Sequence, residues 1–284
     1  MPLQPEIFTI VCDYLTLRDI SSLVLVSSEV NKWVNMDDVV REYYLARKEV
    51  VYDLVCAACK KGYINLLMYL HYTKTTIPIR AMKWASEYGH LSIVEYLYSI
   101  GFSPSSNDNA PIVRASYNSH LSVVKYLCTV GADPRTNDND PIKSASANGH
   151  LDIVEYLHSV GADPTATHNY AIKRASEYGH LSVIKYLHSV GANPTADDNY
   201  AIAWAGCNGH LPVVEYLYSV GADPTADDNH AIKWASNYGH LRVVKYLCSI
   251  GADPTADDNT PIKWANKRGR SKVVEYLRTQ GASL

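Results

Sequence analysis

Six histidines recur along the chain at a step of 30 residues, and they are the first residues whose type and spacing could do chemistry. They are His90, His120, His150, His180, His210 and His240. A zinc ion would need its ligands within about 2.0–2.3 Å of one centre, whereas stacked helices carrying these copies would lie roughly 8–10 Å apart. We therefore predict that each histidine hydrogen-bonds the backbone of the neighbouring segment, and that the chain binds no metal and no cofactor.

Two other groups could bind a metal. Cys56 and Cys59 form one Cys-x-x-Cys pair with no second pair and no histidine close by, so we favour small buried residues over metal or redox work. The turns Asp197-Asp198, Asp227-Asp228 and Asp257-Asp258 lack the graded oxygen spacing of a calcium loop, so we interpret them as a solvated acidic edge. Because no nucleophile elbow or phosphate loop occurs either, we expect no enzyme and no catalytic residues.

Composition narrows the function further. The chain has 284 residues, 47% of them hydrophobic, and a formal net charge of −3, which argues against general nucleic-acid binding. No apolar run approaches the roughly 20 residues of a membrane helix, and no basic segment precedes the first apolar residues. The six cysteines show no framework spacing. We expect a cytoplasmic monomer with reduced thiols.

The histidines belong to a repeat that the stretch from Ala231 to Asn259 represents best, AIKWASNYGHLRVVKYLCSIGADPTADDN. Each copy holds two short apolar segments with helical spacing. Gly209 and Gly221 would end the two helices of one copy as left-handed residues, and turn-forming Asp, Asn and Pro would join it to the next. A single helix pair cannot bury its apolar face, so the repeat predicts a stack.

The motifs Gly-His, Leu-x-Val-Val, Tyr-Leu and Gly-Ala-Asp, together with Thr260-Pro261-Ile262-Lys263, resemble the ankyrin repeat. The pattern is most similar to the ankyrin proteins of giant DNA viruses, which would place the protein in the host cytoplasm. The resemblance implies an all-α solenoid, and the step of 30, shorter than the family's ~33, implies that the β-finger is reduced to a tight turn. Eight units are expected in residues 49–284: approximately 50–76, 77–106, 107–136, 137–166, 167–196, 197–226, 227–256 and 257–284.

Residues 1–48 do not share the repeat. Apolar side chains at helical spacing and candidate caps predict three short helices and a connecting helix. The segment resembles the F-box, with Gln4 departing from that family's usual proline. The resemblance implies docking on the Skp-type adaptor of a cullin–RING ubiquitin ligase; a plain cap closing the stack is the alternative. The residues expected to bind the adaptor are Leu3, Pro5, Ile7, Ile10, Tyr14, Leu15 and Leu17.

The positions that vary most between repeats lie just before Gly-His and at the start of the first helix. In ankyrin proteins these places face a concave groove and contact partners, and Tyr and Asn suit an adaptable contact surface. Free variation of solvent-exposed positions is the alternative. The candidate groove residues are Glu87, Tyr88, Tyr117, Asn118, Asp140, Asn148, Tyr170, Glu177, Tyr178, Tyr200, Asn208, His230, Asn237 and Tyr238.

Four further features give expectations. By the resemblance, Trp84, Trp204, Trp234 and Trp264 pack between helices as core; an exposed aromatic stripe is the alternative. Ser119 stands where a left-handed glycine is expected.

At one second-helix position the charge of the side chain alternates in sign from repeat to repeat, as in Glu155 and Lys185, and neighbouring repeats could form ion pairs there. The basic last unit would be a solvated terminal cap; its charges are Lys267, Arg268, Arg270, Lys272 and Arg278.

These expectations lead to a non-catalytic protein–protein interaction module. The leading hypothesis is a substrate-recruiting subunit of an SCF-type ubiquitin ligase, which uses the F-box for the adaptor and the repeats for an unidentified target protein. The alternatives are a plain ankyrin scaffold and a decoy that binds a host protein or the adaptor without ubiquitin transfer.

Overall fold

The computed structural model describes residues 48–72 and 74–284. The F-box-like segment with its candidate adaptor contacts, Leu3 to Leu17, lies outside the described residues. The described part is built from sixteen helices and contains no strand. None of these helices has the length and apolar character needed to cross a membrane.

The helices alternate along the chain between the first and the second helix of each repeat, and they divide into two compact units at residue 133. In the first unit the helices are α5 (Lys48–Lys61), α6 (Ile64–Tyr72), α7 (Ala81–Glu87), α8 (Leu91–Ser99), α9 (Ser106–Tyr117) and α10 (Leu121–Thr129). In the second unit they are α11 (Thr136–Ala147), α12 (Leu151–Ser159), α13 (Ala166–Glu177), α14 (Leu181–Ser189), α15 (Ala196–Cys207), α16 (Leu211–Ser219), α17 (Ala226–Tyr238), α18 (Leu241–Ser249), α19 (Ala256–Lys267) and α20 (Ser271–Thr279).

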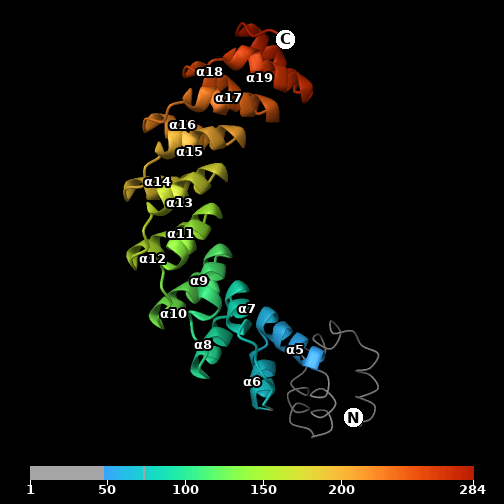
Figure 1. Cartoon of the computed structure of the whole chain (residues 1–284), viewed down its shortest axis with the longest axis vertical. Coiled ribbons are helices and arrows are strands. Elements are labelled where there is room, and N and C mark those ends of the chain that lie inside the picture. The colour runs from blue at the N-terminus through green and yellow to red at the C-terminus, as the bar shows by residue number, and fades with distance from the viewer. Residues whose placement is uncertain (1–47, 73) are drawn as a thin grey trace. The chain divides into compact units, whose positions relative to one another are not determined.

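Within the second unit, first helices pack on first helices and second helices on second helices. Thus α15 contacts both α13 and α17, while α16 contacts α18. Figure 1 shows α12, α14 and α16 along one edge of this stack, with α11, α13 and α15 beside them. The predicted solenoid of helix pairs is therefore confirmed.

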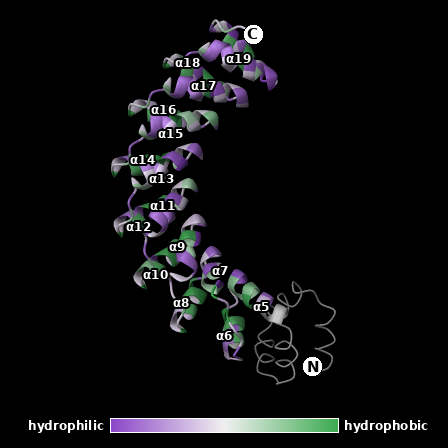
Figure 2. Cartoon of the chain, in the orientation of Figure 1, coloured by the Kyte–Doolittle hydropathy of each residue, from purple (hydrophilic) through white to green (hydrophobic). Residues whose placement is uncertain are grey.

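The core repeats with the sequence. In the repeat of α17 and α18, the side chains of Ile232, Ala235, Val243, Val244 and Leu247 are at most 1% exposed. Burial of each Ile, Val or Leu side chain among them contributes about 1.5–3 kcal/mol. Figure 2 shows hydrophobic segments (green) and hydrophilic segments (purple) along the helix pairs, as expected for helices buried on one side.

The helix ends also follow the prediction. Gly209 and Gly221 have φ angles of 80° and 98°, so both are left-handed residues that let the chain reverse. Ser119 holds the same left-handed conformation with a φ of 65°. A side chain in that region is sterically costly, so Ser119 is a strained position in its repeat.

The junction between repeats is a single left-handed turn. In the second unit Asp197, Asp198 and Asn199 have φ angles of 51°, 50° and 64°, directly before the right-handed part of α15. Asp and Asn tolerate this conformation better than other non-glycine residues because their short side chains bond locally. No strand occurs in residues 48–72 or 74–284, so this turn stands where the family's β-finger was expected to be shortened.

Side chains fix each junction. Asn199 Oδ1 accepts a hydrogen bond from the Asp223 amide at 2.9 Å, and Asp223 Oδ1 accepts bonds from the Thr225 amide and hydroxyl at 2.8 and 2.7 Å. The same asparagine bond recurs at Asn139–Asp163, Asn169–Asn193, Asn229–Asp253 and Asn259–Ser283. The Asp-Asp-Asn turns are therefore structural elements of the stack.

Candidate protein-binding face of the first helices

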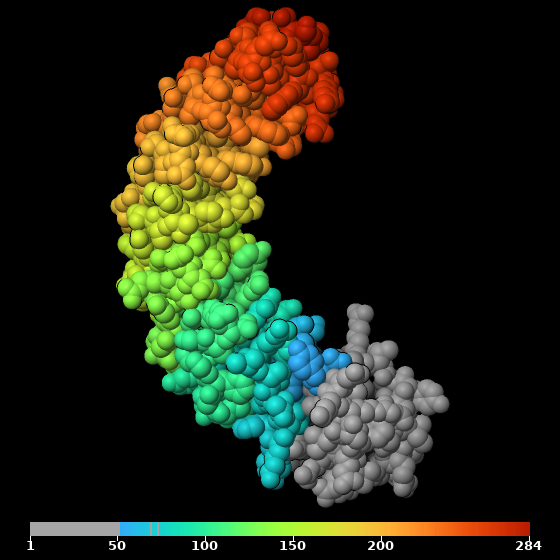
Figure 3. All heavy atoms as spheres, in the orientation of Figure 1, coloured from blue at the N-terminus to red at the C-terminus, as the bar shows by residue number. Residues whose placement is uncertain are grey.

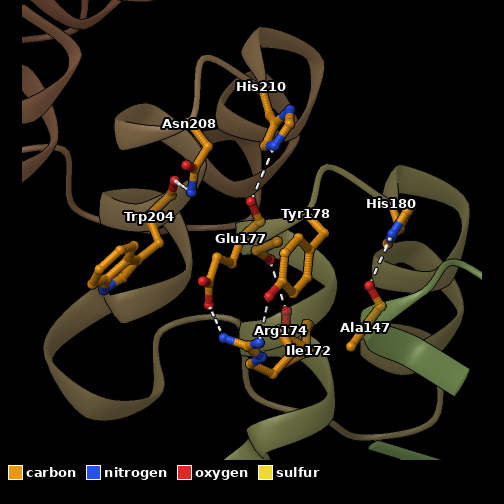
Figure 4. Close-up of polar contacts among 10 residues, drawn as sticks. Ala147, Ile172, Arg174, Glu177, Tyr178, His180, Trp204, Asn208 and His210 are labelled. Atoms are coloured by element: carbon orange, nitrogen blue, oxygen red, sulfur yellow. Dashed lines mark hydrogen bonds and ion pairs between the residues drawn. The ribbon is translucent and has the colours of Figure 1, made fainter. Parts of the chain in front are cut away.

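The repeated histidines bond the backbone of the preceding repeat, as predicted. Because a carbonyl oxygen only accepts, the histidine Nε2 carries the proton and donates it. His180 Nε2 lies 3.1 Å from Ala147 O, and His210 Nε2 lies 3.0 Å from Glu177 O (Figure 4). His90 and His120 make the same bond to Lys60 O and Glu87 O in the first unit, both at 3.0 Å.

Residues 48–72 and 74–284 contain no group of three or more histidine, cysteine, aspartate or glutamate side chains placed to hold an ion. Cys59 is fully buried, and burial raises the pKa of its thiol to about 12. A thiol held neutral in this way is a poor metal ligand and a poor nucleophile. The expectation of a buried residue is therefore confirmed for Cys59, whereas Cys56 is half-buried.

The candidate groove residues lie at different depths. Five tyrosines are exposed by 39–48%: Tyr88, Tyr117, Tyr170, Tyr178 and Tyr238. Asn208 is also exposed, and the residues that are half-buried are Glu87, Asn118, Asp140, Asn148, Glu177, Tyr200 and His230. Asn237 departs from the expectation, because it is only 6% exposed.

The asparagines before Gly-His have a local role. Asn208 Nδ2 donates to Trp204 O at 3.0 Å, one turn earlier in its own helix (Figure 4). Asn118 and Asn148 make the equivalent bonds to Arg114 O and Ser144 O. These asparagine side chains are thus engaged within their own helices, whereas the tyrosines at this position, Tyr88, Tyr178 and Tyr238, are exposed by 47–48%.

Arg174 organises the surface at the end of α13. Its Nη1 lies 2.5 Å from Glu177 Oε2, its Nη2 donates to Tyr178 Oη at 2.5 Å, and its guanidinium lies 4.7 Å from the Tyr178 ring centroid (Figure 4). Charge-assisted and cation–π contacts together hold the ring in place. Sequence reasoning missed Arg174, although its (i, i+3) and (i, i+4) spacing to these residues was a usable signal.

An aromatic stripe crosses α15, α17 and α19. Tyr200 stacks on Trp204 at 5.5 Å, and Trp204 is followed by His230 at 6.1 Å and by Trp234 a further 5.8 Å away. The Trp234 ring then meets Trp264 at 5.0 Å. We call these five residues the aromatic stripe.

The stripe corrects the expectation that the tryptophans belong to the core. Trp84, Trp204, Trp234 and Trp264 are all half-buried. The buried positions of the first helix are instead those of Ile232 and Ala235, on either side of Trp234. The tryptophan position therefore lies at the edge of the core, where each side chain is partly packed and partly exposed.

The second helices show a different ladder from the expected ion pairs. No ion pair joins Glu155 and Lys185 in the part of the chain that the structure describes. Lys185 Nζ instead lies 5.5 Å from the ring centroid of Tyr216, whose hydroxyl lies 2.8 Å from His188 Nδ1. The charged side chains at this position therefore interact with a tyrosine of the next repeat and not with each other. Burial raises the pKa of Tyr186, and the negative charge of Glu155 raises it further.

Comparison with known proteins agrees with this geometry. A family model described as ankyrin repeats (3 copies) matches residues 54–138, 82–168, 142–228 and 204–284. No curated protein matches the chain. Because the family model covers well over half of the residues, and because the matched region is the stack of helix pairs with its exposed first-helix surface, the chain belongs to the ankyrin-repeat family of protein–protein interaction modules.

Proposed function

We propose that this protein is the substrate-recruiting subunit of a cullin–RING ubiquitin ligase of the SCF type. The first-helix face of the repeats would bind a target protein, and residues 1–48 would bind a Skp-type adaptor. The chemistry would belong to the partner enzymes. The chain would raise the effective concentration of the target's lysines near the conjugating enzyme.

One observation carries the target-binding half of the proposal. The first helices present exposed tyrosines at a recurring position, and in the second unit these continue into the aromatic stripe. Aromatic side chains supply large contact areas at a low cost in conformational entropy. Arg174 already holds Tyr178 in place, which reduces the ordering cost on binding. The adaptor-binding half rests on the resemblance of residues 3–33 to the F-box.

The adaptor half is tested by a pull-down with purified Skp-type adaptor. The wild-type chain should retain the adaptor, and Ile7→Asp combined with Leu15→Asp should abolish retention, because carboxylates would enter the predicted apolar contact. Thr9→Asp, which lies outside the predicted apolar stripe, is the matched control and should retain the adaptor. A wild-type chain that does not retain the adaptor would contradict the proposal.

The two alternatives predict other results. A plain scaffold would not bind the adaptor but would still bind the target through the repeats. A decoy would bind its protein without changing that protein's turnover. Measuring the target's half-life in cells with the full chain, and with a chain lacking residues 1–48, separates recruitment from both: only recruitment predicts faster turnover that depends on residues 1–48.

A further inference from the structure

The last repeat of the second unit differs in charge from the rest of the chain. Residues 257–284 contain six lysines and arginines and three acidic residues, a net charge of +3, whereas the whole chain has −3. The basic residues are Lys263, Lys267, Arg268, Arg270, Lys272 and Arg278. A local basic patch on an otherwise acidic protein attracts anionic groups selectively to that place.

Part of this charge lies where the aromatic stripe ends. Tyr238 stacks on Trp234 at 5.7 Å, and Arg268 takes the position of Tyr238 in the next repeat, one helical turn after Trp264. Both Lys267 and Arg268 are exposed. Trp264, Lys267 and Arg268 therefore lie within about one turn of each other at the end of α19, which belongs to the orange-to-red C-terminal part of the chain in Figure 3.

Two arginines are anchored there by Asn237. Arg268 Nε lies 3.4 Å from Asn237 Oδ1, and Arg270 Nε donates to Asn237 O at 3.3 Å. Arg270 stands in the position of the repeated histidines and keeps their backbone bond. Among the residues that the structure describes, neither arginine uses its Nη groups in a contact. Planar groups held in this way suit carboxylates, which they can bind through two parallel hydrogen bonds.

The N-terminal ends of the helices that carry the stripe have the opposite charge. The left-handed turns before α15, α17 and α19 expose six carboxylates: Asp197, Asp198, Asp227, Asp228, Asp257 and Asp258. A nucleic-acid strand laid along the stripe would bring a phosphate to every nucleotide, including those next to these carboxylates. A segment with its negative charge confined to one end fits the surface better.

We propose that the target is recognised through a short peptide segment that is acidic at one end and apolar at the other. This inference rests on the proposed target-binding function of the first-helix face. The acidic residues bind Lys267, Arg268 and Arg270, and the apolar residues pack on Trp264 and Trp234. Charge then sets the direction of the segment, and the indoles supply most of the buried area.

A display library of random 16-residue peptides, selected on the immobilised full chain, tests the proposal. Enriched peptides should combine Asp or Glu with Leu, Ile, Phe or Trp, and their affinity is measured by fluorescence anisotropy. The variant Lys267→Glu with Arg268→Glu should weaken binding at least tenfold. The matched control, Lys272→Glu with Arg278→Glu, makes the same charge change on α20 and should alter affinity less than twofold.

Circular dichroism establishes that both variants fold, and the neutral pair Lys267→Gln with Arg268→Gln should give an intermediate loss. The proposal is overturned if no peptide is enriched, if the two charge-reversed variants weaken binding equally, or if a twelve-residue thymidine oligonucleotide binds more tightly than the selected peptides. Enriched peptides that lack acidic residues yet lose binding on Trp204→Ala would also overturn it, while leaving target binding by the first-helix face standing.

Discussion

His210 donates its Nε2 proton to the carbonyl of Glu177, 33 residues earlier, and its ring occupies the space that a Cβ on Gly179 would need. A Cβ built on Gly179 would lie 2.5 Å from His210 Nδ1. The same pairing recurs at Gly149–His180 and Gly209–His240. The Gly-His dipeptide thus couples consecutive repeats, since the glycine of one repeat accommodates the histidine of the next.

This coupling predicts unequal costs for two glycine substitutions. Gly179→Ala should destabilise the protein by about 2–4 kcal/mol, because strain at a φ of 82° adds to the clash with His210. Gly191→Ala is the control: its φ is 101°, but an added Cβ meets nothing within 4 Å, so about 1–2 kcal/mol is expected. Urea unfolding measures both, and equal costs would contradict the coupling.

Ser119 offers a stabilising substitution. Ser119→Gly should raise the free energy of unfolding by about 1 kcal/mol, because glycine has no steric penalty at a φ of 65°. Ser92→Gly, within the right-handed helix α8, is the control and should cost about 0.5–1 kcal/mol. Thermal unfolding in a single buffer compares them, and the prediction is wrong if both changes destabilise the protein.

Thr167 is a second strained position. It has a φ of 53°, where the equivalent residues of later repeats are Asp197, Asp227 and Asp257. A β-branched side chain is disfavoured in this conformation, so Thr167→Asp should stabilise by about 0.5–1 kcal/mol. The reverse change, Asp227→Thr, should destabilise by a similar amount. Opposite shifts of the melting temperature are expected, and shifts of the same sign would exclude strain as the cause.

Stability should fall in mild acid because of the half-buried histidines His180 and His240. Burial lowers the pKa of His180 and His240 below the ordinary value of 6.5. The unfolded chain therefore binds more protons than the folded one below that value, and stability present above pH 6.5 is lost as the pH falls. Melting temperatures between pH 8 and pH 5 measure the slope. In His180→Gln the melting temperature should fall less between pH 8 and pH 5 than it does in the wild type. An equal fall in both proteins would show that His180 does not contribute to the pH dependence.

The repeat made much of this fold predictable. Alignment of the repeats on the Gly-His step predicted the helix pairs, the left-handed helix ends such as Gly209, and the histidine hydrogen bonds. Each repeat shows the same residue pattern, so each one supports the same prediction. The strained conformation of Ser119 could be inferred in the same way. These are features that one repeat, or one repeat and its neighbour's backbone, determines.

What sequence reasoning missed depends on how successive repeats are spaced and rotated. The 5.0 Å contact of Trp234 with Trp264 and the position of Lys185 over Tyr216 depend on that geometry, which periodicity does not supply. The buried Asn237 contacts Arg268 and Arg270, which occur only in the last repeat. The left-handed turn at Asp197 was recognised as a turn, but three consecutive left-handed residues exceed what turn propensities indicate.

The central claim is that the first-helix face, and not the second helices, binds the target. Quantitative affinity purification from cells compares wild type, Tyr178→Ala with Trp204→Ala, and Tyr218→Ala, which removes a 41% exposed tyrosine from the second helix α16. The proteins enriched by the wild-type chain should be retained by Tyr218→Ala and lost from the double variant. Equal retention by all three, or loss only with Tyr218→Ala, would contradict the account.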